Sequence, residues 1–247
     1  ELPGRHAGAR VMTLAADWER FWLEPGIGAQ SMLAWRGVEA QHVVSTMRLV
    51  DSAAEQDLLE QLLEASKPAL PATRQPRHYL LLTPFRYRPH HPSRFRPAHA
   101  RGQWYGAEAL YAACAEVAYW RRRFILDSTG LQDQTLLTEH SFFQAAIDGQ
   151  AMDLMAPPWN QARALWTQGD DYAATQAVAA GAQQRGVQWL AYESARASGQ
   201  RCAVVFDPDC LAEPAGGLDH TLQTWHCKAT RASVMFTRGR ERHEWHF

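Results

Sequence analysis

The chain has 247 residues, of which 46% are hydrophobic, so it can bury a substantial core and is not globally disordered. Its formal net charge is −1 and its isoelectric point lies near 6.9, so no overall field favours nucleic acid or an anionic membrane. The four cysteines are widely spaced and form no CxxC pair, which favours reduced thiols in a cytoplasmic protein over a disulfide framework.

Neither membrane insertion nor metal binding is expected from the sequence. No apolar run is long enough to span a bilayer, and the first residues, ELPGRHAGAR, lack the apolar centre of a signal peptide. The 11 histidines include no HExxH motif and no paired Cys/His spacing, so we expect no metal site.

The first part of the chain predicts helices. Residues 13–24 fit a short amphipathic helix, residues 31–49 carry a mixed helical pattern, and Asp51-Ser52 cap a helix that runs to Ser66 with leucines on one face. Three prolines within residues 67–77 mark a connector. We therefore expect an N-terminal helical extension over residues 1–77 and a main domain over residues 78–247.

The main domain mixes both kinds of element. Strands are predicted at residues 78–83, 103–105, 187–192 and 202–206, and helices at 107–123 and 172–184, the latter ended by Gly186. Residues 124–157 suggest a strand, a loop and a helix around 141–147, and residues 222–247 a β-hairpin that turns at Gly239. This mixture predicts an α+β fold with a mixed or mainly antiparallel sheet flanked by helices.

Three functional groups lie close together in residues 85–124. The segment opens with the arginine-rich loop FRYRPHHPSRFRP, continues to Tyr105, and reaches Glu116 eleven positions later among small residues of the predicted helix. Arginine offers a planar fork for phosphate, and a carboxylate can stabilise the positive charge that develops when a ribosyl bond breaks. The combination is typical of a nucleotide-cleaving site, although a solvated loop and a solvent-facing glutamate stay open as the simpler interpretation.

Four blocks, in this order, resemble the RES domain, which is named for its Arg, Glu and Ser residues. They are FRYRPHHPSRFRP, WYGAEALYAACAEVAYW, DYAATQAVAAGAQQRGVQWLAYESAR and CAVVFDP, and they cover residues 78–208. RES proteins are typically toxins of bacterial toxin–antitoxin pairs, with a fold similar to ADP-ribosyltransferases. The resemblance implies that NAD is the substrate, that its nicotinamide–ribose bond is cleaved by hydrolysis or phosphorolysis, and that a helical Xre-type antitoxin is the partner.

The resemblance also implies the site residues. The first arginine is Arg86, with Arg88 as a competing assignment, and the remaining positions are Arg94, Tyr105, Glu116 and Ser194. Arg86, Tyr105, Glu116 and Ser194 are expected to be catalytic, and Arg86, Arg94 and Tyr105 to hold NAD. The chain departs from the family pattern at Glu193, where proline often stands, and in its longer ends.

Other functions stay open at this point. The resemblance does not decide between water, phosphate and a protein side chain as acceptor, so a mono-ADP-ribosyltransferase is the main alternative. The arginine loop also fits a nucleic-acid-binding module, against which the near-neutral isoelectric point counts. A protein that only binds a partner through its helical N-terminal part is a further alternative, and the oligomeric state is not decided.

Overall fold

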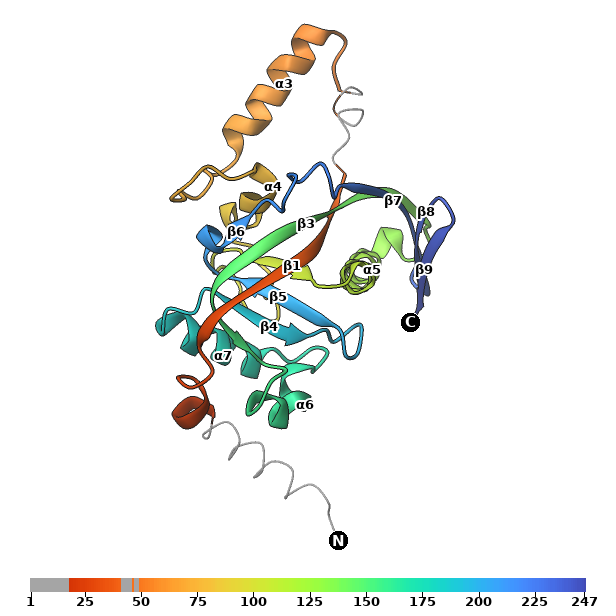
Figure 1. Ribbon diagram of the computed structural model, residues 1–247. Coiled ribbons are helices and arrows are strands. Elements are labelled where there is room, and N and C mark those ends of the chain that lie inside the picture. The colour runs from red at the N-terminus through yellow and green to blue at the C-terminus, as the bar shows by residue number, and fades with distance from the viewer. Residues whose placement is uncertain (1–17, 41–45, 47–48) are drawn as a thin grey trace.

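The chain folds into a mixed α+β structure around one sheet, as the sequence predicted (Figure 1). The structure is a computed structural model, and it describes residues 18–40, 46 and 49–247. The strands are β1 (Gly28–Glu39), β2 (Trp104–Ala107), β3 (Leu136–Asp153), β4 (Trp189–Glu193), β5 (Arg201–Val205), β6 (Leu211–Ala212), β7 (Gln223–Ala229), β8 (Ser233–Arg238) and β9 (Glu241–His246).

The helices lie between and around these strands. The α-helices are α3 (Ala53–Ser66), α4 (Tyr79–Leu82), α5 (Leu110–Asp127), α6 (Arg163–Trp166) and α7 (Ala173–Gln184). Single turns of 3-10 or π-helix are η1 (Trp18–Trp22), η2 (Thr83–Arg86), η3 (Thr129–Leu131), η4 (Trp159–Ala162) and η5 (Pro208–Cys210). In the described part of the chain, no helix combines the length and apolar character that crossing a membrane requires.

The longest strand pair joins β1 to β3. They run antiparallel from Gly28 opposite Ala151 to Glu39 opposite His140. The helical interpretation of residues 31–49 is therefore wrong for residues 31–39, where burial at Met32 and Ala34 alternates with exposed neighbours at the strand period of two. A division of the chain at residue 77 would separate β1 from this sheet, so the helical extension expected over residues 1–77 does not stand apart from the main domain.

The pairing of five strands closes into a ring. The order is β1-β2-β5-β4-β3, and β3 pairs again with β1, while β7, β8 and β9 continue from β3 as a meander. The helix expected around residues 141–147 is wrong, because this segment is the middle of β3 and is paired with β1 on one edge. Long-range pairing overrides the short-range pattern here.

Other sequence predictions agree with the structure. The helices predicted at 107–123 and 172–184 are α5 and α7, Gly186 follows α7 at a φ of 78°, and the β8–β9 hairpin turns at Gly239 with a φ of 59°. The strand expected at residues 78–83 is wrong, because His78 caps α4 by accepting a hydrogen bond from the Leu80 amide. Part of the helix predicted at 13–24 appears as η1, while residues 13–17 lie outside the described residues.

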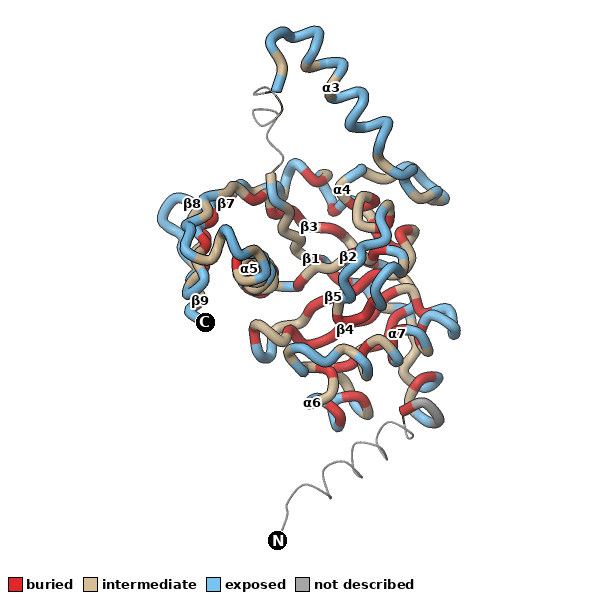
Figure 2. Tube along the Cα trace, turned by 180° about the vertical axis from the view of Figure 1, so that it is seen from behind, coloured by how far each residue is buried: buried red, intermediate tan, exposed pale blue. Residues whose placement is uncertain are grey.

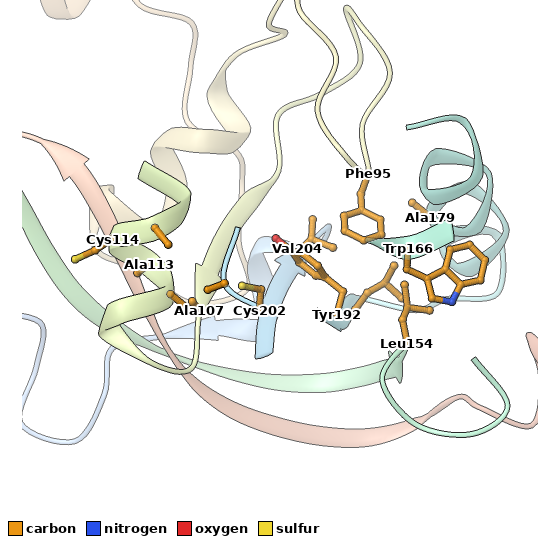
Figure 3. Close-up of a cluster of buried hydrophobic side chains, with 14 of the residues drawn as sticks. Phe95, Ala107, Ala113, Cys114, Leu154, Trp166, Ala179, Tyr192, Cys202 and Val204 are labelled. Carbon is orange, nitrogen blue, oxygen red and sulfur yellow. The ribbon is translucent and has the colours of Figure 1, made fainter. Parts of the chain in front are cut away.

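Small residues bring α5 close to the strands of the ring. Figure 3 shows Ala113 of α5 near Ala107 of β2 and Cys202 of β5. The alanines of α5 at positions 112, 113, 115 and 118 are all buried. This close approach places Glu116, which follows Ala115 in α5, at the edge of the ring.

By contrast, α3 buries no side chain against the described structure, and its printed contacts are polar ones, such as the ion pair from Glu64 to Arg86. Ser52 caps it as predicted, accepting a hydrogen bond from the Glu55 amide at 3.2 Å. None of its residues is buried, and Leu58 and Leu62 are 55% and 60% exposed. Figure 2 shows the helix standing out from the body of the molecule.

The buried histidine of β3 makes stability depend on pH. Burial, followed by the charge of Arg121, lowers the pKa of His140 from 6.5 to about 4, and its Nδ1 atom has no hydrogen-bond partner among the described residues. The unfolded chain therefore takes up this proton as the pH falls below 6.5, whereas the folded chain does so only near 4. Stability that is present above pH 6.5 is lost between these values.

We expect His140→Phe to reduce the loss of unfolding free energy between pH 7 and pH 5 by on the order of 1–2 kcal/mol. Phenylalanine fills the same space beside Phe236 and carries no proton. Denaturant titrations of both proteins at the two pH values measure the difference. An unchanged pH dependence in the variant would show that His140 is not responsible.

Candidate active site

A cavity of about 890 Å³ lies between β1, β2 and α5. This volume is within the range of small-molecule sites. Its charged lining residues are Arg36, Arg94, Arg121, Arg196, Glu39 and Glu116. Its aromatic lining residues are Trp35, Tyr105, Trp120, Phe124, Tyr172 and Tyr192. Arginines and rings around few carboxylates suit an anionic ligand with flat groups.

Ser194 holds the carboxylate of Glu116. The hydroxyl of Ser194 donates a hydrogen bond of 2.5 Å to Glu116 Oε1 and accepts hydrogen bonds of 3.0 Å from the amides of Arg196 and Ala197. Because two amide donors occupy the lone pairs of the hydroxyl, its only proton points to Glu116. Ser194 is 1% exposed, so its role is to hold Glu116 in position. Glu116 itself lines the cavity.

Tyr105 anchors the arginine-rich loop. Its hydroxyl lies 2.8 Å from Ser93 Oγ, donates to Gln103 Oε1 at 3.0 Å and accepts from the Phe95 amide at 3.3 Å. Burial raises the pKa of Tyr105 to about 12, so the hydroxyl is neutral at physiological pH. The structure thus gives Tyr105 a part in shaping the cavity wall through its ring.

Arg94, which was predicted to hold NAD, lies in the wall of the same cavity. It is 8% exposed and donates from Nη1 to the carbonyls of Trp166 and Gln168 at 2.9 and 2.7 Å. Its guanidinium also stacks on the ring of Tyr172 at 5.4 Å. These contacts fix the side chain while it lines the cavity that holds Glu116.

Arg86 does not lie with Glu116. Its guanidinium forms an ion pair of 2.8 Å with Glu64 of α3 and donates to the carbonyl of Pro68, and it lines a neighbouring cavity. Arg88 is exposed and lines neither cavity. The arginine-rich loop therefore supplies one arginine to the wall around Glu116, and the prediction of Arg86 for that place is not supported.

Arg36 of β1 occupies the place expected for Arg86. Its Nη1 donates to the Tyr105 carbonyl at 2.8 Å, its guanidinium lies 5.6 Å from the Trp104 ring, and its Nε is buried without a partner among the described residues. None of the ion pairs in the described ranges involves Arg36. Burial lowers the pKa of this guanidinium to about 10, which still leaves it charged at neutral pH.

A sequence signal for Arg36 exists but needs the correct element. Once residues 28–39 are a strand, Arg36 falls on the same face as the buried Met32 and Ala34. An arginine at such a position is rare unless it is paired or functional. The helical interpretation of this segment hid that signal.

Arg196 and Glu193 flank the serine. Arg196 stacks 3.3 Å from the centroid of the Tyr119 ring and donates to the Gly169 carbonyl at 2.9 Å, beside the cavity. Glu193 does not line the cavity, and its carboxylate accepts hydrogen bonds from Nε and Nη2 of Arg163 at 2.6 and 2.5 Å. These hydrogen bonds lower the pKa of Glu193. The departure from proline at this position thus introduces an ion pair behind Ser194.

Removing the charge of Arg36 should cost little stability. Because no described carboxylate forms an ion pair with the guanidinium, we expect Arg36→Met to keep the free energy of unfolding within about 1 kcal/mol of the parent, or to raise it. Arg163→Met, the comparison, deprives the buried Glu193 of its cation and should be clearly destabilised. Denaturant titration measures both. A loss of more than about 3 kcal/mol in Arg36→Met would show that Arg36 is part of a balanced ion pair.

One comparison with known proteins, the match to a family model, shows the family. The sequence matches the RES domain over residues 68–228, which is more than half of the chain. No curated protein matches it. Among solved structures, it is similar to the crystal structure of the M. tuberculosis MbcT–MbcA toxin–antitoxin complex, with 16% identity, a TM-score of 0.46, and coverage of 89% of this chain and 92% of that chain. The chain belongs to the RES domain family.

Proposed function

We propose that this protein is an NAD-consuming enzyme that breaks the bond between nicotinamide and ribose, and that it acts as the toxin of a toxin–antitoxin pair. The observation that carries the proposal is the single supported carboxylate, Glu116, in a cavity lined by arginines and aromatic rings. Membership of the RES domain family supports the same reaction.

One carboxylate is sufficient for this reaction. Glycosidases use two, because a second carboxylic acid must protonate the leaving oxygen. The nicotinamide of NAD is already a cation, so it takes the electron pair of the broken bond and leaves as a neutral molecule without a proton. Glu39, the other carboxylate of the cavity, is held by Arg121 at 2.7 Å, which fits a site with a single working acid group.

Glu116 then acts on the ribose. Positive charge builds up on its C1′ atom as nicotinamide departs, and an adjacent carboxylate stabilises that charge. An acceptor oxygen then forms the new bond to C1′. If the acceptor is water, it releases one proton, which Glu116 is placed to accept, and ADP-ribose is the product.

The arginines have a separate task. NAD carries two negative charges on its pyrophosphate, and Arg36 has a buried Nε without a partner in the described part of the chain. A phosphate oxygen there would supply the acceptor that the fold withholds. Arg94 and Arg196 are fixed by backbone carbonyls and aromatic rings in the same wall.

The acceptor and the partner are separate parts of the proposal. Purified protein incubated with NAD, with and without inorganic phosphate, should release nicotinamide together with ADP-ribose or its phosphorylated form. Label from NAD that appears on a protein would instead favour the mono-ADP-ribosyltransferase. The partner that we propose, a helical Xre-type antitoxin in the cytoplasm, rests on the family alone, and co-expression with a helix-turn-helix protein encoded next to this chain tests it.

We expect Glu116→Gln to reduce NAD cleavage at least 100-fold, because the amide cannot stabilise the charge on ribose. The matched control is Glu108→Gln, which changes an exposed carboxylate just before the same helix and outside the cavity. Release of nicotinamide measures activity, and circular dichroism confirms folding. Full activity in a folded Glu116→Gln protein would refute the assigned role.

A further inference from the structure

A second cavity adjoins the one that holds Glu116. Its volume is about 950 Å³, and Arg36, Glu39, Ser93 and Tyr105 line both cavities. The bridge from Arg36 to the Tyr105 carbonyl therefore stands at the junction between the two spaces.

We propose that the second cavity binds the adenosine half of NAD, and we refer to it as the adenosine chamber. The proposal rests on the proposed function, because it takes NAD as the substrate. In NAD the pyrophosphate joins the two nucleosides at the middle of the molecule. If Arg36 binds the pyrophosphate and the nicotinamide riboside reaches Glu116, the adenosine extends from the other side of Arg36, into the chamber.

The wall of the chamber suits a flat, uncharged base. Val38 of β1 and Leu80 of α4 are partly buried and form an apolar surface. Tyr87 lines the same cavity and is 38% exposed, so its ring is available for stacking. Aromatic and aliphatic surfaces of this kind are the usual contacts of bound bases and other flat ligands.

Apart from Arg36, the cations that line the chamber are already bound to other groups of the protein. Arg96 donates to the carbonyls of Pro89 and Pro97 at 3.2 and 2.9 Å. Arg86 and Lys67 both contact Glu64 at 2.8 Å. Of the basic residues described around the chamber, only Arg36 has a buried nitrogen atom without a partner, and this atom lies at the junction. The anionic part of the ligand therefore belongs at Arg36 and the neutral nucleoside beyond it.

The two halves of NAD test this arrangement separately. Adenosine monophosphate and nicotinamide mononucleotide serve as probes of the chamber and of the Glu116 cavity. Val38→Trp should fill the chamber, and Leu33→Trp, at a 50% exposed position on the opposite face of the same strand, is the matched control. Tyr87→Ala, at an exposed loop position, is the second chamber variant if Val38→Trp does not fold.

We expect the parent protein to bind adenosine monophosphate in calorimetry and to cleave NAD with a kcat/KM at least 100-fold above that for nicotinamide mononucleotide. Val38→Trp and Tyr87→Ala should each weaken binding of adenosine monophosphate and lower this kcat/KM ratio at least tenfold, while Leu33→Trp should keep the values of the parent.

Equal cleavage of NAD and of the mononucleotide by the parent would overturn the chamber, as would binding of adenosine monophosphate that neither chamber variant weakens. A parent protein that cleaves neither compound, but whose binding of adenosine monophosphate falls in both chamber variants, would overturn the proposed function and still support the chamber.

Discussion

The antiparallel pairing of β1 with β3 is the constraint on which the site depends. Its register places Arg36 opposite Phe143 and sets Arg36 and Val38 on one face of the strand. A slip of one residue would turn both side chains to the other face and remove the arginine from the junction of the cavities. The strand therefore does more than complete the sheet, because its register decides where the guanidinium of Arg36 lies.

The guanidinium of Arg36 has no carboxylate partner among the described residues, whereas the carboxylate of Glu116 accepts a hydrogen bond from Ser194. Arg36 is half-buried, and its guanidinium contacts one carbonyl and one indole ring among the described residues, which costs stability that a bound anion can restore. Glu116, by contrast, is fixed by a serine whose own hydrogen bonds are complete. Under the proposed function, this arrangement separates binding of the pyrophosphate from action on the ribose, and both groups are held in place without a ligand.

The sequence predicted most residues of the candidate site but not Arg36. Tyr105, Glu116, Ser194 and Arg94 come together because short-range patterns place α5 and the end of β4 correctly, and the motif order is specific. Arg36 was missed because residues 28–39 become a strand through pairing with β3, more than a hundred residues away in the sequence. The same long-range pairing explains the helix wrongly expected within β3, whereas α4 was missed because a short apolar run is ambiguous between strand and helix.

The most direct test is a crystal structure of the protein with an unreactive NAD analogue. In this analogue, a carbon replaces the ring oxygen of the ribose that carries nicotinamide. The account predicts that a pyrophosphate oxygen lies within hydrogen-bonding distance of Arg36 Nε, with the nicotinamide end beside Glu116. A pyrophosphate bound to Arg86, with Arg36 Nε still without a partner, would contradict it.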